Sequence, residues 1–325
     1  MPRKFTFIAL ATTAALAMLW GCLFYLELGT QTAASYARCE NVRFKRELGQ
    51  HTSGPKLVVI AGSSAARGIN AEILSRITGV QTINFGLFAG VGPDIVLYEA
   101  RRVLRPGDIA LLALEYNHYV YPGPTADAID YVLGCGREYF SELPAAEKLR
   151  YIFGLGFERI YQSLFVDSRV IAREVDQSNL TPRGDMKLVP AVFPGLSRQD
   201  QDRMSLYRPI PIEIDPRSDG ARTIAAFVAW AKLHGVAVLA TWPNTIYFPQ
   251  YDHTEGFSDL RRFYDGLGVK MVGDASSSLL PLSMFYNTQY HLNIEGIRMR
   301  SQRLAADLLK VLPSAEHSDL RTVTQ

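Results

Sequence analysis

Cysteine is scarce in this chain, which has only three in 325 residues. No pair of Cys or His residues has the spacing of a metal site, so we expect no bound metal and no cofactor. Cys22 lies inside a long apolar run, which leaves Cys39 and Cys135 for pairing. In an oxidising compartment these two thiols can form a disulfide, and two free thiols are the alternative.

Excess charge is also missing, because the formal net charge is only +2. This balance gives no electrostatic reason to expect a nucleic acid as partner. The chain has no internal repeat and no extended low-complexity tract. Its hydrophobic content of 48% is sufficient for the core of one large domain or two small ones.

A run without charges extends from Phe5 to Leu26, directly after Arg3 and Lys4. Such a run is long enough to cross a hydrocarbon core as a helix. Positive charge before the run predicts a cytoplasmic N-terminus and an exported remainder. We therefore predict a signal anchor over residues 1–28, which attaches the chain to the inner membrane with its bulk in the periplasm.

Two other interpretations of this run stay open. The segment from Leu19 to Cys22 loosely resembles a lipobox, and cleavage before Cys22 would give a lipoprotein. Trp20 fits that motif poorly, and the apolar run continues to Leu26 instead of opening into a polar tether. A cleaved signal peptide usually has a shorter apolar core and a small-residue cleavage site.

Beyond the run, residues 29–55 are expected to form a juxtamembrane linker or a lead-in helix. Apolar segments rich in β-branched residues then alternate with amphipathic segments, which predicts an α/β fold with a mostly parallel five-stranded sheet. The expected strands are residues 57–61, 80–84, 108–114, 236–240 and 269–272. The α/β domain covers residues 56–118 and 217–313, followed by a tail at 314–325. Asp219 and Asn293 are expected to cap helices, and a helical pattern begins near Asn70.

Residues 119–216 interrupt the alternation. They combine helical segments at 145–153 and 157–175 with Pro and Gly, and they lack a convincing buried strand. We interpret them as a helical insertion over the carboxyl edge of the sheet. The insertion serves as a lid or substrate platform, or it is purely structural.

Polar residues follow the expected strands at the edge where α/β folds bind ligands. Gly62-Ser63-Ser64 follows the first strand, a glycine-rich loop from Asn84 to Gly92 follows the second, and Glu115-Tyr116-Asn117 follows the third. His291 lies in the loop before the last helix. Each feature also has a structural explanation, because Ser and Asn favour turns and a single His is often a satisfied surface or core residue.

Together these four blocks resemble the signature of the SGNH (GDSL-type) hydrolases. The matching positions, in chain order, are Ser64, Gly86 or Gly90, Asn117 and His291. The resemblance implies an SGNH/flavodoxin-like three-layer α/β/α sandwich. It also implies a Ser64 nucleophile with His291 as general base and then general acid. The oxyanion would be held by the Ser64 N–H, by a glycine N–H from Gly86 or Gly90, and by the Asn117 amide.

The chain departs from the family pattern at three positions. Ser63 stands where Asp is usual, and Glu115 stands where Gly is usual. The acid of the last block is missing, because Thr288 lies three residues before His291 and Asn287 lies four before it. Asn287 resembles a replacement for that acid. Its carbonyl oxygen can orient the imidazole at Nδ1, but it cannot stabilise the imidazolium by charge.

By this resemblance the chain is an acyl esterase or O-acetyltransferase acting on an exported or cell-envelope polysaccharide. Membrane-anchored members that modify envelope polymers are the relatives it is most similar to. The alternative is a catalytically degenerate SGNH-like protein, which binds or scaffolds within a polysaccharide assembly complex. Ser63 and Asn287 favour that alternative. The enzyme is favoured by the intact positions Ser64, Gly90, Asn117 and His291.

Overall fold

The computed structural model describes residues 2–165, 179–193 and 196–312. The chain forms two compact units. The first, here named the anchor unit, comprises residues 1–41 and 124–176. The second, the sheet unit, comprises residues 42–123 and 177–325. The predicted insertion at 119–216 is therefore divided between the two, and its part from residue 177 onward belongs with the sheet. Residues 166–175 of the predicted helix and the tail at 314–325 lie outside the described residues.

The sheet unit contains the predicted five-stranded sheet, and all of its strands are parallel. The strands are β1 (Leu57–Ala61), β2 (Thr82–Gly86), β3 (Ile109–Leu112), β4 (Ala237–Thr241) and β6 (Lys270–Val272). Their order is β2-β1-β3-β4-β6, which is the flavodoxin-like doubly wound order. None of them comes from residues 119–216, as predicted. A separate two-stranded sheet pairs β5 (Thr245–Ile246) with β7 (Leu279–Leu280).

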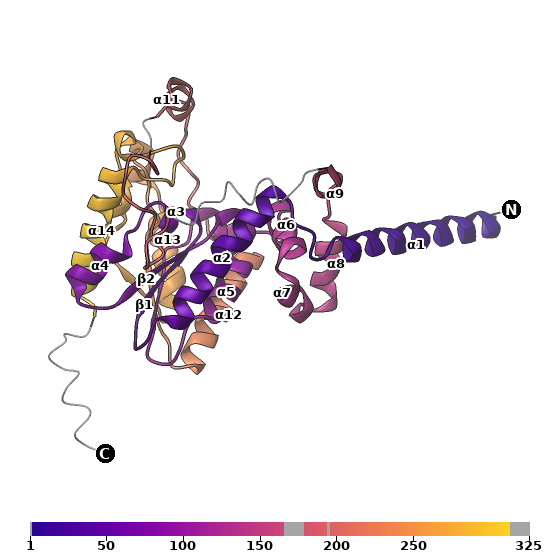
Figure 1. Cartoon of the computed structure of the whole chain (residues 1–325), viewed down its shortest axis with the longest axis horizontal. Helices are drawn as coiled ribbons and strands as arrows, with labels where there is room; N and C mark the ends of the chain where they lie inside the picture. Colours follow the sequence, from indigo (N-terminus) through magenta and orange to yellow (C-terminus); the bar gives the residue numbers. More distant parts are fainter. Residues whose placement is uncertain (1, 166–178, 194–195, 313–325) are drawn as a thin grey trace, which may run out of the picture. The chain divides into compact units, whose positions relative to one another are not determined.

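Helices cover both faces of the sheet (Figure 1). Helix α4 (Ala71–Thr78) packs with α14 (Ile294–Leu309) on one face, and α5 (Gly92–Arg101) packs with α12 (Asp219–Leu233) on the other. The remaining helices of the sheet unit are α3 (Ser63–Ala66), η1 (Ala89–Val91), η2 (Tyr116–Val120), α11 (Arg198–Ser205), η4 (Pro249–His253), α13 (Gly256–Gly266), η5 (Ala275–Ser278) and η6 (Leu282–Met284). The α/β architecture is therefore present.

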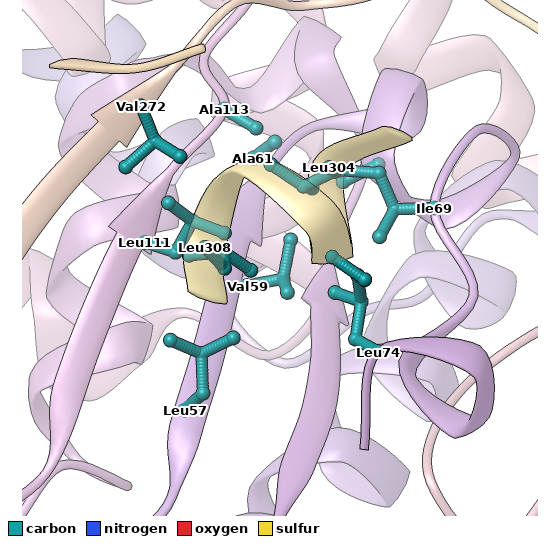
Figure 2. Packing of buried hydrophobic residues seen from close by; sticks show 12 residues of the cluster. Leu57, Val59, Ala61, Ile69, Leu74, Leu111, Ala113, Val272, Leu304 and Leu308 are labelled. Atoms are coloured by element: carbon teal, nitrogen blue, oxygen red, sulfur yellow. The ribbon is translucent and has the colours of Figure 1, made fainter. Parts of the chain in front are cut away.

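Alternate residues of β1 build the core beneath α14. Leu57, Val59 and Ala61 pack with Leu304 and Leu308 of α14, and Figure 2 shows these side chains gathered between the strand and the helix. Every residue of β1 is buried, because the helices on the other face cover the intervening side chains. Each fully buried Leu or Val contributes about 1.5–3 kcal/mol of transfer free energy. This burial explains why the unbroken apolar run forms a central parallel strand.

Of the two predicted helix caps Asn293 is confirmed, and Asn70, near which a helix was expected to begin, also caps its helix. Asn70 accepts a hydrogen bond from the Ile73 amide, and Asn293 accepts one from the Gly296 amide. The prediction for Asp219 is wrong by one residue, because the cap of α12 is Ser218, whose hydroxyl accepts from the Ala221 amide at 3.0 Å. Asp219 instead lies in the first turn, where its charge favours the helix dipole.

The anchor unit begins with α1 (Pro2–Glu27), and Arg3–Glu27 has the length and the mean hydropathy, 2.0, to span a membrane. Its other helices are α2 (Ala33–His51), whose second half belongs to the sheet unit, and α6 (Ala126–Gly134), α7 (Arg137–Glu142), α8 (Ala145–Phe153) and α9 (Phe157–Phe165). Residues 29–55 thus contain a lead-in helix. A disulfide joins Cys39 of α2 to Cys135 after α6, and Arg38 forms ion pairs with Asp127 and Asp130 beside it.

The disulfide closes a loop with a sequence separation of 96 residues. The loss of chain entropy in the unfolded state predicts a stabilisation of about 4–5 kcal/mol for a loop of this length. We expect the double variant Cys39→Ala/Cys135→Ala to lose most of this free energy of unfolding, measured by urea titration of the detergent-solubilised chain. Cys22→Ala is the matched control and should leave the titration unchanged, because Cys22 is free and exposed. Equal stability of the double variant and the parent would contradict the prediction.

Candidate active site

The candidate site lies at the carboxyl ends of β1 and β3. In the strand order β2-β1-β3-β4-β6, β2 lies on one side of β1, and the later strands β3, β4 and β6 lie on the other side. The strand order therefore reverses between β1 and β3, and doubly wound folds bind ligands at such a switch point. β1 leads into Gly62 and then α3, which begins at Ser63. β3 leads through Ala113 and Leu114 to Glu115, which precedes η2. The first and third sequence blocks therefore meet at this edge.

The buried Glu115 carboxylate connects these two blocks. Its Oε1 accepts a hydrogen bond from the Ser64 amide at 2.8 Å, and its Oε2 accepts one from the Gly62 amide at 3.0 Å. Glu115 is fully buried, so both bonds lie in a medium of low dielectric constant where hydrogen bonds to charged groups are strong. The backbone N–H that a Ser64 nucleophile would offer to an oxyanion is thus already bonded to a negative group.

The hydroxyl of Ser64 is also directed inward. Ser64 is 1% exposed, and its Oγ donates to the Ala113 carbonyl at 3.4 Å. Ser63, which precedes it in the same turn, is half-buried, and its hydroxyl makes no hydrogen bond with the described residues. The more accessible hydroxyl of this turn is therefore the one at Ser63. The sequence does not show which of the two serines is more exposed, because this depends on how α3 is rotated where it follows β1.

The second block approaches the first one closely. A Cβ atom at Gly62 would lie 2.5 Å from the Cα atom of Ala89, so glycine is needed for this contact with η1. Gly90 is half-buried within η1. Gly86 is fully paired, because its amide donates to Asn84 Oδ1 at 2.8 Å and its carbonyl accepts from Lys45 Nζ at 2.7 Å. In this arrangement Gly86 has no N–H to offer a substrate.

In the third block, Asn117 is exposed and its neighbour His118 is buried. Asn117 is exposed on η2 and makes no hydrogen bond with the described residues. The buried His118 lies on the other side of η2, where its Nε2 is 3.1 Å from the Ala89 carbonyl and its Nδ1 is 3.5 Å from Glu115 Oε2. His118 thereby links the second and third blocks. Neither Glu115 nor His118 was expected as a site residue, although Glu115 was noted as a departure from the family pattern.

The last block contains the hydrogen bond expected between Asn287 and His291. Asn287 Oδ1 lies 2.8 Å from His291 Nδ1, which assigns the proton to Nδ1. The His291 Nε2 atom makes no hydrogen bond with the described residues. Arg203 and Tyr207, from the former insertion, both donate to the Asn287 carbonyl at 3.2 Å. The segment that contains α11 therefore holds the His291 loop in place.

The environment of His291 disfavours its protonated form. Burial lowers the pKa of His291 to about 3, and the nearby positive charge of Arg67 adds to this effect. Arg67 ends α3, the helix that begins in the first block, and its carbonyl accepts a hydrogen bond from the Leu292 amide at 2.9 Å. The imidazole is thus neutral at physiological pH, with an oriented ring that binds a proton only weakly.

The structure gathers the four blocks at one edge of the sheet. Besides the contact of Leu292 with Arg67, Tyr290 lies close enough to Glu115 that burial and the Glu115 charge raise the pKa of its hydroxyl. The expected dyad is not formed, however. The Ser64 hydroxyl bonds to Ala113, and no hydrogen bond joins it to His291. The blocks converge, but the reacting groups do not contact one another.

A second buried polar cluster lies behind the second block. Asp185 caps α4, because its carboxylate accepts from the amides of Ala71 and Glu72, and it also accepts from Asn84 Nδ2. Burial raises the pKa of Asp185 to about 6 and lowers the pKa of Lys45 to about 7, and the attraction between the two opposes both changes. No sequence pattern predicts this cluster, because Lys45 and Asp185 lie 140 residues apart.

A cavity of about 730 Å³ lies beside the His291 loop. Its lining is mainly apolar and includes Phe193, Met204, Phe285, Tyr286 and Ile294. The polar lining residues are Gln201, Ser283, Asn293 and Glu295. Among the described residues, no group of three His, Cys, Asp or Glu side chains is placed to hold a metal ion.

No protein-family model matches the chain, and no curated protein matches it in sequence. The relation to SGNH hydrolases therefore rests on the four blocks and their placement alone.

The paired bonds of Glu115 predict a large stability effect at this position. Glu115→Gln retains one acceptor but presents its NH₂ group to the second amide, so one charge-assisted bond is lost and two donors face each other. We expect the free energy of unfolding to fall by about 2–4 kcal/mol, measured by urea titration. Glu213→Gln is the matched control, because Glu213 is exposed and has no partner among the described residues; it should change the free energy by less than about 0.5 kcal/mol. A fully stable Glu115→Gln variant would show that the two bonds contribute little.

The bond between Asn287 and His291 predicts a change in titration. Asn287→Asp places a carboxylate at Nδ1, which stabilises the imidazolium and should raise the pKa of His291 from about 3 by about 1–3. Histidine-selective NMR titration measures this, with His291→Gln assigning the signal. Because His291 titrates lower in the folded state than in the unfolded state, the parent loses stability as pH falls from about 6.5 to 3. This loss should shrink in the variant. Asn117→Asp is the control, and an unchanged His291 pKa in Asn287→Asp would contradict the geometry.

Proposed function

We propose that the chain is a membrane-anchored, catalytically silent SGNH-like protein that binds an acylated exported or envelope polysaccharide within an assembly complex. The observation that carries this proposal is the Glu115 carboxylate on the amides of Gly62 and Ser64. Ester hydrolysis through Ser64 requires N–H donors aimed at a developing oxyanion, and loss of one donor costs about 3 kcal/mol in the transition state. Here the donor is occupied, and the occupying group is itself negative.

The properties of His291 support the same conclusion. A general base must accept the serine proton and become an imidazolium in the transition state. Burial and the charge of Arg67 hold the pKa of His291 at about 3, which disfavours that imidazolium. Asn287 orients the ring but supplies no compensating charge. These properties support a site in which the blocks lie together while their groups are unsuited to acyl transfer.

The cavity beside the His291 loop supports a binding role. Its mainly apolar lining with four polar residues suits a ligand that has both acyl and hydroxyl groups, such as an acylated sugar. Phe193 and Tyr286 contact edge to face with their ring centroids 5.7 Å apart, which gives the wall a rigid aromatic surface. The identification of the polymer as an exported polysaccharide rests on the family resemblance.

Two features support export to the periplasm, and a third supports an uncleaved anchor. Arg3 and Lys4 precede the apolar helix, which favours a cytoplasmic N-terminus. The Cys39–Cys135 disulfide is typical of an oxidising compartment. Trp20 and Phe24 pack inside the anchor unit, so cleavage before Cys22 would remove part of a folded contact. These contacts favour an uncleaved anchor over a lipoprotein.

One observation favours acyl transfer as the second candidate. The half-buried Ser63 hydroxyl lies in the same turn as Ser64, and His291 has its Nδ1 bonded while its Nε2 is left for a nucleophile. In that case Ser63, and not Ser64, would be the residue acylated, with His291 as the base. The oxyanion would then need donors other than the Ser64 and Gly86 amides.

Labelling of the purified chain with a fluorophosphonate probe separates these candidates. For the silent site we expect no adduct on either serine, and hydrolysis of 4-nitrophenyl acetate no faster than that of His291→Ala. Tandem mass spectrometry assigns any adduct to its residue. An adduct on Ser64 overturns the proposal, and an adduct on Ser63 that disappears in His291→Ala establishes the second candidate. Binding of acetylated but not deacetylated polysaccharide, weakened by Tyr286→Ala, is the positive result expected for the binding role.

A further inference from the structure

Helix α9 exposes its large apolar side chains and directs polar side chains into the protein. Phe157, Tyr161, Leu164 and Phe165 recur at helical spacing on one face, and each of them is at least 63% exposed. The opposite face is directed into the protein. An isolated exposed apolar residue is ordinary, but a continuous exposed stripe of large aromatic and aliphatic groups marks an interaction surface.

The buried face of α9 is polar because it neutralises the end of α1. Arg159 Nη1 lies 2.8 Å from Glu27 Oε2, and its Nε lies 2.6 Å from Asp130 Oδ1. Ser163 donates to Glu27 Oε1 at 2.8 Å. Arg159 and Ser163 are four residues apart and so share one side of the helix. These bonds fix the rotation of α9 and leave its apolar stripe outward.

The apolar stripe is continuous with the helix that can span a membrane. The Trp20 ring meets the Phe157 ring edge to face with centroids 5.0 Å apart, and Trp20 Nε1 donates to the Ile152 carbonyl at 3.0 Å. On α8, the exposed Leu149 and Phe153 extend the apolar surface. Tryptophan with one polar contact and an apolar ring is typical of the boundary between acyl chains and headgroups.

The position of Trp20 along α1 places its contact with Phe157 at the depth expected for a helix in the membrane surface. At about 1.5 Å per residue from Phe5, a hydrocarbon core of about 30 Å ends near Tyr25. Trp20 then lies about 8 Å inside that limit, and Phe157 lies beside it. Amphipathic helices that lie in a membrane surface bury their apolar faces about 5–10 Å deep. The depth set by α1 and the depth required by α9 therefore agree.

We propose that α9, together with Leu149 and Phe153 of α8, lies in the surface of the same lipid bilayer that α1 crosses. This inference rests on the proposed anchoring by α1. The bilayer takes up the apolar stripe, while Arg159 and Ser163 stay bonded to Glu27 on the protein side. The anchor unit is thus held at the membrane by two elements, and α9 fixes the tilt and rotation of α1.

Lipid quenching in reconstituted full-length protein tests this. In a Cys22→Ala background, the environment-sensitive fluorophore NBD is attached at Leu164→Cys, at Leu206→Cys or at Leu16→Cys, in vesicles of phosphatidylcholine and phosphatidylglycerol. Leu206 is the matched control, because it is a leucine of the sheet unit that is 70% exposed, against 68% for Leu164. We expect doxyl-labelled lipid to quench the label at 164 at least twofold more strongly than the label at 206, with the reverse order for aqueous iodide.

The label at Leu16 distinguishes a failure of the surface role of α9 from a failure of the membrane insertion of α1. Quenching by lipid at 16 but not at 164 overturns the surface role of α9 and leaves the anchor intact. Absence of lipid quenching at 16 shows instead that α1 does not enter the bilayer. Protection of the label at 164 from both quenchers means that protein covers the stripe, which also overturns the proposal.

Discussion

The contact of the Glu115 carboxylate with two backbone amides determines the arrangement of the candidate site. It joins the turn after β1 to the end of β3, the two positions that flank the switch point of the sheet. A buried carboxylate is costly unless it is fully hydrogen-bonded, and the amides of Gly62 and Ser64 supply those bonds. His118 adds a connection from Glu115 to Ala89 in the second block. The first three blocks are therefore held together by one charge, and the turn is rigid because of it.

This contact involves one of the positions at which the chain departs from the SGNH pattern that it resembles. That pattern has an acid in the first block and a glycine in the third, whereas here Ser63 and Glu115 occupy those positions. The Glu115 carboxylate accepts hydrogen bonds from the backbone amides that a catalytic turn would leave open for an oxyanion. The bonds that stabilise the turn therefore occupy the N–H donors that an oxyanion would need.

Sequence reasoning located the five strands, their parallel arrangement and the bond between Asn287 and His291, because each depends on residues close together in the chain. It did not show where β3 ends or which side chains of the turns after β1 and β3 are buried. β3 ends at Leu112, two residues earlier than expected, and η2 then directs Glu115 inward and Asn117 outward. In the same way, the direction of α3 decides that Ser64 is buried and Ser63 is half-buried. Lys45 and Asp185 were beyond prediction, since only the folded chain brings these distant residues to Gly86 and Asn84.

The orientation of α9 shows a further limit of periodicity. A helical pattern of apolar residues defines a face, but it does not say whether that face meets protein or lipid. For α9 the decision comes from Glu27, which ends the apolar helix and needs partners as it enters the protein. Only the side of α9 that contains Arg159 and Ser163 can supply them, so this side turns inward and Phe157 and Leu164 turn outward. The charge at the end of α1 thereby selects the face that α9 presents, and in our proposal the lipid bilayer covers that apolar face.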